Sequence, residues 1–281
     1  MSLSFIYRGG NRIWYQVVGS GSPLLLIQGL GYPSDANWRV VPELATRHTV
    51  ILLDNRGVGR SDNPAKPWTI ESMAADAAAV LEDAGIAQAA VAGFSMGGLV
   101  ALELALSRPD LVASLILGCT SPGGKAAIPM SAEVGEQFVD WGNLPAEQAA
   151  WQAAKVCYSE STPHEAIAKD IAVRTAVPTP RSGYHHQMRA VALYRGSRDR
   201  LRRWWRRPTL VVHGTDDLIV PVANADSLTE AIPHAEVVLV PGAGHILMTD
   251  AKQELVDAML DFLERHRGGA FHVDPIASIT R

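Results

Sequence analysis

The sequence predicts an α/β protein with a mostly parallel central sheet, flanked by helices and carrying an inserted helical cap. Two observations lead to this class. Short apolar runs, each suited to a buried strand, alternate with segments of helical apolar spacing in both halves of the chain. Between residues 121 and 206 the strand-like runs stop, and prolines separate short Ala-rich helical segments. We therefore expect a core formed by residues 1–120 and 207–281, with the cap at 121–206 between its two parts.

The first part of the core is expected to begin with a hairpin. Residues 4–7 and 13–18 are strand-like, and Gly9-Gly10-Asn11 between them suits a turn with positive φ. After the stretch at residues 93–98, the apolar face from Leu99 to Leu106 predicts a helix, which Arg108-Pro109 ends. The other elements predicted here are strands at 24–27, 50–53, 89–92 and 111–117, and helices at 38–45 and 70–85.

After the cap the alternation resumes. Strands are predicted at 209–212 and 237–240, and helices at 222–231 and 252–265. The tail from residue 268 has no strong periodicity, and we assign it no role. Because the carboxyl ends of parallel strands share one edge of a sheet, polar residues that follow these strands can converge there.

Composition narrows the classes of function. A net charge of −4 gives no general attraction to nucleic acid or membranes. The basic run Arg195–Arg207 is expected to be a cap segment with solvated arginines and with Trp204 and Trp205 packed inside. Two cysteines, Cys119 and Cys157, are too few for a disulfide framework and have no metal-ligand spacing. No signal peptide or membrane-spanning run is recognised, so we expect a soluble cytoplasmic protein.

The stretch at residues 93–98 reads Gly-Phe-Ser-Met-Gly-Gly and joins a predicted strand to a predicted helix. A turn this tight leaves no room for side chains two residues before or after the serine, which accounts for Gly93 and Gly97. Ser95 is therefore expected in a strained backbone conformation that lifts its hydroxyl above the sheet edge. The Met96 N–H, at the start of the helix, can stabilise an oxyanion. This pattern predicts that Ser95 is a nucleophile.

A serine nucleophile needs a base, and the base needs an acid that orients it. Strand 209–212 leads into a loop with Asp216 and Asp217, and strand 237–240 leads into a loop that ends at His245. These groups can meet Ser95 at the carboxyl edge of the sheet. His213 ends a strand and is expected to be a buried structural residue. A metal pair at His185-His186 is not expected, because adjacent residues on a helix point to different faces.

In these motifs the chain resembles α/β-hydrolase-fold serine esterases of the capped, single-domain type, over nearly all of residues 4–265. The resemblance also rests on Asp-Asn-Arg-Gly-Val-Gly-Arg-Ser at 54–61, Gly-Thr-Asp-Asp at 214–217 and Gly-Ala-Gly-His at 242–245. It implies the α/β-hydrolase fold, with the triad in the order Ser, Asp, His. In this family the acid lies three residues after the glycine and four before Pro221, which points to Asp217 and leaves Asp216 as the alternative.

The resemblance further implies a second oxyanion donor in the loop after strand 24–27. The family usually has His-Gly at this point, whereas this chain has Gln28-Gly29-Leu30. The backbone N–H groups of Leu30 and Met96 are therefore the expected donors. The substrate is expected to contact Phe94, Trp141, Leu247 and Met248. Further apolar cap residues are divided between the pocket and contacts among the cap helices: Met130, Phe138, Leu144, Trp151, Tyr184, Met188, Val191 and Tyr194.

The predicted function is hydrolysis of a carboxylic ester or lactone of a small, largely apolar substrate through an acyl-enzyme. Ser95 would attack the carbonyl, His245 would carry the proton and Asp217 would orient His245. The expected partner is this small molecule, without a cofactor, metal, nucleic acid or membrane. Two alternatives stay open: a cofactor-free perhydrolase that forms peracids from hydrogen peroxide with the same triad, and a non-catalytic ligand receptor on the same fold. Neither the particular ester nor the oligomeric state can be predicted.

Overall fold

The computed structural model describes residues 2–65, 68–141, 143–177, 179–201 and 207–266. Its centre is a sheet of eight strands in the order β1-β2-β4-β3-β5-β6-β7-β8. Strand β2 pairs antiparallel with β1 and β4, and every other pairing is parallel, as the predicted fold class requires. The strands are β1 (Ser2–Arg8), β2 (Asn11–Val18), β3 (Ser22–Ile27), β4 (His48–Leu53), β5 (Ala89–Phe94), β6 (Val112–Gly118), β7 (Thr209–Gly214) and β8 (Glu236–Val240).

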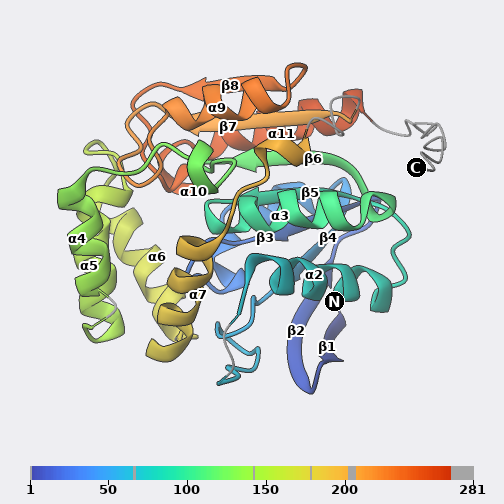
Figure 1. Cartoon of the computed structure of the whole chain (residues 1–281), viewed down its shortest axis with the longest axis horizontal. Coiled ribbons are helices and arrows are strands. Elements are labelled where there is room, and N and C mark those ends of the chain that lie inside the picture. Colours follow the sequence, from blue (N-terminus) through green and yellow to red (C-terminus); the bar gives the residue numbers. More distant parts are fainter. Residues whose placement is uncertain (1, 66–67, 142, 178, 202–206, 267–281) are drawn as a thin grey trace, which may run out of the picture.

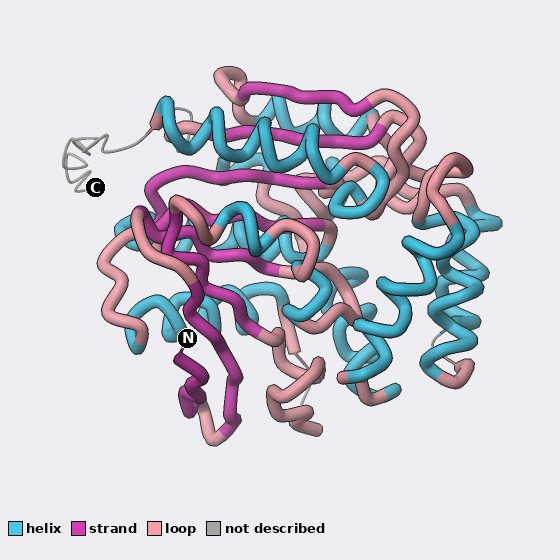
Figure 2. The backbone as a smooth tube through the Cα atoms, turned by 180° about the vertical axis from the view of Figure 1, so that it is seen from behind, coloured by secondary structure: helices cyan, strands magenta, loops and turns pink. Residues whose placement is uncertain are grey.

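Helices cover both faces of the sheet (Figures 1 and 2). One face packs against α2 (Ile70–Asp83), α3 (Met96–Ser107) and α9 (Ala223–Ala231). The other packs against α1 (Val41–Leu44) and α11 (Lys252–Arg265). Leu25 of β3 faces the first set of helices and its neighbour Leu24 faces the second, because successive side chains of a strand alternate. Since both faces are buried, the central strands are continuous apolar runs in the sequence.

The predicted helix at 38–45 is shorter in the structure. A 3-10 helix η1 (Ser34–Asn37) is followed by α1, a single turn in which Pro42 occupies the amino end. Proline has no N–H to continue a preceding helix, so α1 begins at Val41 instead of Trp38. Two further 3-10 turns are η2 (Pro109–Leu111) and η3 (Gly124–Ala126), and a short helix α10 is Leu247–Asp250.

The predicted cap region contains α4 (Ala132–Trp141), α5 (Ala146–Cys157), α6 (His164–Ala176), α7 (Arg181–Leu193) and the short α8 (Arg198–Leu201). Helices α5, α6 and α7 each begin directly after a proline, namely Pro145, Pro163 and Pro180. Proline suits a helix start because its φ is already helical and no N–H is lost there. In Figure 1, α4 to α7 lie together at one end of the sheet. The limits 121–206 for the cap stay a prediction.

Two sequence predictions fall outside the described residues: the packing of Trp204 and Trp205, and the tail from residue 268. Within the described part of the chain, no helix has the length and apolar character needed to cross a membrane.

Candidate active site

Ser95 lies between β5 and α3 with φ 55° and ψ −123°, a conformation that L-residues rarely adopt. The chain can turn this sharply because of its glycines. A Cβ on Gly93 would lie 2.2 Å from the Gly97 oxygen, and one on Gly97 would lie 2.1 Å from the Ile27 oxygen. Both glycines are therefore required by close backbone contacts on either side of the serine.

The neighbouring strand holds the strained residue in place. The Ser95 N–H donates to the backbone carbonyl oxygen of Gly118 at 2.9 Å. The Thr120 hydroxyl donates to the backbone carbonyl oxygen of Ser95 at 2.7 Å. Cys119 lies between these two partners and also has positive φ, at 46°. The bonds from the end of β6 thus compensate part of the backbone strain at the end of β5.

His245 and Asp217 form the next pair of the site. The His245 Nδ1 lies 2.8 Å from the Asp217 Oδ2, across the loops that follow β8 and β7. Asp217 is 4% exposed, and its Oδ1 accepts the N–H groups of Ile219 and Val220 at 2.9 and 2.8 Å. Asp216, the alternative acid, is exposed and accepts a bond from its neighbour Thr215.

Asp217 is held in its charged form. Burial alone would raise the pKa of its carboxyl, but the adjacent His245 and the hydrogen bonds from His213 and His245 lower the pKa well below its usual range. A carboxylate can only accept, so the His245 Nδ1 is the donor of the pair. In the neutral ring the Nε2 is then the unprotonated nitrogen, which is the form a general base needs.

His213 is fully buried, as expected for a structural histidine. Its Nε2 lies 2.8 Å from the Val220 oxygen and 3.4 Å from the Asp217 Oδ2. His213 therefore contacts the loop that carries Asp217, and it does not line the pocket of Ser95.

The loop that carries His245 is bound to the end of α5. The N–H groups of His245 and Ile246 donate to the Cys157 oxygen at 2.8 and 3.1 Å. Asp250 of α10 strengthens this connection, because its Oδ2 accepts the N–H of Gly244 at 2.8 Å and that of Ser159 at 2.9 Å. The position of His245 thus depends on a carboxylate that sequence reasoning missed.

The predicted oxyanion loop passes close to Ser95. A Cβ on Gly29 would lie 3.1 Å from the Ser95 Cβ. Among the hydrogen bonds of the described residues, none uses the N–H of Leu30 or of Met96. Met96 is the first residue of α3, whose first-turn N–H groups have no partner within the helix. Both N–H groups are therefore available to an oxygen bound beside Ser95.

Gln28 replaces the histidine that the family usually has. Its buried side chain donates to the Asn37 Oδ1 at 2.7 Å and contacts the Met248 sulfur at 3.2 Å, while its Oε1 accepts the Gly29 N–H at 3.3 Å. The loop is also held from the cap, where the Gln187 Oε1 accepts the Gly31 N–H at 2.8 Å. Hydrogen bonds from both sides thus fix the loop without the histidine.

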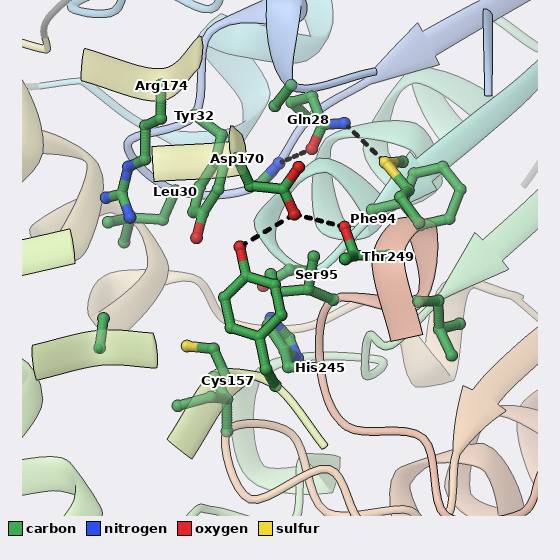
Figure 3. A pocket seen from close by; sticks show the side chains of 18 of the residues that line it. Gln28, Leu30, Tyr32, Phe94, Ser95, Cys157, Asp170, Arg174, His245 and Thr249 are labelled. Carbon is green, nitrogen blue, oxygen red and sulfur yellow. Dashed lines mark hydrogen bonds between the residues drawn. The ribbon is translucent and has the colours of Figure 1, made fainter. Parts of the chain in front are cut away.

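Ser95 and His245 face one pocket between the sheet edge and the cap (Figure 3). Leu30 lines it too, as do all four residues predicted to contact the substrate: Phe94, Trp141, Leu247 and Met248. Asp217 and Met96 are not among the lining side chains, since Asp217 lies behind His245 and the role expected of Met96 belongs to its backbone. The polar lining residues that were not predicted are Tyr32, Tyr158, Asp170, Arg174 and Thr249.

The other apolar cap residues have divided roles. Phe138 and Tyr184 line the pocket, and Leu144 lines a second cavity beside it. Trp151 instead stacks on His164, with ring centroids 4.8 Å apart. Tyr194 packs against the core helices. Apolar character alone did not distinguish these positions, because both environments are apolar.

Within the described residues, one group could in principle hold a metal: Cys119, His213 and Asp217, whose ligand atoms lie within 4.8 Å of one another. Burial raises the pKa of the Cys119 thiol well above its usual range, so the sulfur is a neutral thiol and a poor ligand. Both carboxylate oxygens of Asp217 already accept hydrogen bonds. The arrangement suits support of His245 better than metal binding.

The arrangement of Ser95, His245 and Asp217 at the edge of this α/β sheet is typical of one family of proteins. The model of the alpha/beta hydrolase fold family matches residues 22–156 and 174–252, and the chain belongs to that family.

Individual relatives agree with this class. A protein of Azorhizobium caulinodans with the provisional name carbamate hydrolase RutD is 29% identical over 275 residues, which cover 92% of this chain and 98% of that protein. The esterase of Thermogutta terrifontis is 26% identical with a TM-score of 0.80, covering 95% of this chain and 99% of its own. Est816, an N-acyl homoserine lactone degrading enzyme, is 26% identical with a TM-score of 0.78, covering 92% and 100%.

Proposed function

We propose that this protein hydrolyses a carboxylic ester or lactone through an acyl-enzyme on Ser95. The observation that carries the proposal is the convergence at one edge of the sheet of a strained serine, a histidine oriented by a buried carboxylate, and two backbone N–H groups that have no partner among the described residues. Among the relatives, the names esterase and lactone-degrading enzyme support the same reaction class.

In the first half of the reaction, the Ser95 oxygen attacks the substrate carbonyl while its proton passes to the Nε2 of His245. The carbonyl oxygen becomes an oxyanion, which accepts hydrogen bonds from the Leu30 and Met96 N–H groups. When the tetrahedral intermediate collapses, the bond to the alcohol oxygen breaks and His245 returns the proton to the leaving alcohol. Asp217 stabilises the imidazolium in between.

In the second half, His245 takes a proton from water, and the hydroxide oxygen attacks the acyl carbon. When this intermediate collapses, the bond between the acyl carbon and the Ser95 Oγ breaks, His245 returns its proton to the Oγ, and the acid leaves. No step needs a group beyond these residues and water.

The residues around Ser95 favour an apolar group beside the scissile carbonyl. Phe94, Leu247 and Met248 reach the pocket from the core, and Trp141 reaches it from the cap. All four are buried at 7% exposure or less, so a substrate methylene placed among them leaves water. Each such methylene contributes up to about 0.8 kcal/mol to binding.

The direct test is release of p-nitrophenolate from p-nitrophenyl butyrate by the wild type and by the Ser95→Ala variant. Turnover that disappears in the variant supports the proposal. Wild-type protein that binds the ester without turning it over would instead support a receptor on this fold. A parallel assay for peracid in the presence of hydrogen peroxide separates hydrolysis from perhydrolysis, since peroxide would replace water in opening the same acyl-enzyme.

A further inference from the structure

Arg174 of α6 brings a positive charge into the pocket that holds Ser95. Its guanidinium lies 4.1 Å from the ring centroid of Tyr32, a contact between a cation and an aromatic face. In Figure 3 both residues lie apart from Ser95 and His245. Among the described residues Arg174 forms no ion pair with a carboxylate.

The carboxylate nearest to Arg174 in sequence is already engaged. Asp170, one helical turn earlier, is the only carboxylate among the described residues that line the pocket. Its Oδ1 accepts bonds from the Arg39 guanidinium at 2.9 Å and from the Trp38 ring N–H at 3.0 Å. Its Oδ2 accepts the hydroxyls of Thr249 at 2.5 Å and Tyr158 at 3.3 Å. Arg39 therefore balances the negative charge of Asp170. Asp170 is thus not the counter-charge of Arg174.

Four further ionisable side chains that line the pocket with Arg174 are neutral. Burial raises the pKa of the hydroxyls of Tyr32, Tyr158 and Tyr184, and it raises the pKa of the Cys157 thiol to about 12. At neutral pH these groups are protonated and supply no negative charge. Within the described ranges, the pocket wall thus holds one carboxylate paired with Arg39 and one guanidinium with no counter-charge.

A second cavity continues from this point. It shares Trp141, Ala153, Arg174 and Tyr184 with the pocket of Ser95, so Arg174 stands between the two spaces. Its other polar side chains are Thr175, Thr179 and Arg181, and its described lining contains no carboxylate. Most of the lining is apolar, including Leu144, Pro145 and Ala149, and both charged groups of the described lining, Arg174 and Arg181, are cations.

From this arrangement we infer that the substrate carries a carboxylate, which Arg174 binds at the end of an apolar segment that reaches from the scissile carbonyl. This inference rests on the proposed function and names its substrate class: an ester or lactone whose acyl part ends in an anionic group. The apolar residues beside Ser95 bind the methylenes, and the guanidinium, a group suited to two parallel hydrogen bonds, binds the carboxylate.

The test uses mono-p-nitrophenyl esters of adipic, pimelic and suberic acid, together with the same esters in which the free carboxyl is capped as a methyl ester. Each pair has nearly the same length and differs in charge. For the wild type we expect kcat/KM for the best anionic ester to exceed that of its capped partner by about tenfold or more, the usual range for a charge-assisted hydrogen bond. Added salt should reduce this ratio, because ions screen the attraction.

Arg174→Gln should lower the anionic-to-capped ratio by about 10- to 100-fold, mainly through KM, and Arg174→Lys should restore part of it. Lys169→Gln is the matched control, because it removes an exposed positive charge of the same helix that lines neither cavity; its ratio should stay near that of the wild type. A wild-type ratio near unity, or equal losses on both esters in Arg174→Gln, would overturn the inference. Absence of turnover with every ester would instead contradict the proposed function itself.

Discussion

Two carboxylates of the site have different surroundings: Asp217, buried behind His245, and Asp170, half-buried in the wall of the pocket. Asp217, on the loop after β7, accepts the N–H groups of residues two and three positions later in the chain and is bound to one histidine on the next loop. Asp170, on α6 of the cap, accepts bonds from Trp38, Arg39, Tyr158 and Thr249, which come from other segments. The first carboxylate is fixed mostly by its own loop, and the second by the way the cap docks.

This difference separates chemistry from specificity. The reacting groups lie at strand ends of a sheet whose central strands are buried, where small displacements are costly. Trp141 and Arg174, which we propose distinguish substrates, lie instead on the cap helices α4 and α6, outside the sheet. Changes at the sheet edge should therefore affect every ester alike, whereas changes in the cap should alter the order of preference among esters. The following experiments test this division, from the largest effect to the smallest.

Ser95→Ala should lower ester turnover by a factor on the order of 10⁴ or more, because no other group can form the acyl-enzyme. The loss should be the same for short and long acyl chains. Steady-state kinetics measure it, and circular dichroism with thermal unfolding checks that the fold is retained. Residual activity within about tenfold of the wild type would refute the assignment of the nucleophile.

Asp217→Asn should lower kcat by about 10³- to 10⁴-fold, since the amide no longer favours the tautomer of His245 that accepts the proton. Asp216→Asn is its matched control, one residue away and exposed. It should leave kcat within about threefold, the range typical of surface changes. The opposite ranking would show that the loop after β7 presents the other aspartate.

The pH profile of kcat/KM should have an acid limb with a single ionisation. His245 must be neutral to accept the serine proton, so activity is lost as the pH falls. The pKa of Asp217 is lowered, so its carboxylate stays ionised over this range and adds no second step. For the same reason Asp217 contributes stability above the unfolded-state pKa, and this contribution is lost as the pH falls through the folded-state pKa. A limb that requires two ionisations would contradict this account.

Asp250→Ala should lower kcat by about tenfold, because the Gly244–His245 backbone loses its anchor and the base is less well placed. Asp250→Asn keeps an oxygen for the Gly244 and Ser159 N–H groups and should retain most of the activity. Equal losses in both variants, or a fall in thermal stability without a fall in kcat, would mean that Asp250 has no part in positioning His245.

Trp141→Ala should lower kcat/KM only slightly for esters with short acyl chains and more for esters with long acyl chains. In the wild type, kcat/KM should rise from acetate by up to about fourfold per methylene until the pocket is full. Removing the indole, which is 6% exposed, should flatten this rise and cost about tenfold on the longest chains. A uniform loss on all esters would show that Trp141 only holds the cap together.

The sequence predicted the sheet edge well because its signals are local. Glycines two residues before and after Ser95 indicate a tight turn. The loops with Asp217 and His245 directly follow recognisable strands. The helix predicted at 38–45 is too long, because Pro42 has no N–H with which to continue a helix from Trp38. Asp170, Arg174 and Asp250 were missed for a different reason. A charged residue on a helix is usually solvated, and each of these three contacts a partner far away in the sequence: Ser159 for Asp250, Arg39 for Asp170 and Tyr32 for Arg174.

The central claim, that Ser95 is the nucleophile of an acyl-transfer reaction, is tested most directly by intact-mass and peptide mass spectrometry after incubation with diethyl p-nitrophenyl phosphate. We expect a single diethylphosphoryl group on the chain, located on Ser95, with loss of esterase activity in proportion to labelling and no label on Ser95→Ala. Inactivation with the label on another residue, or full activity in protein labelled at Ser95, would contradict the claim.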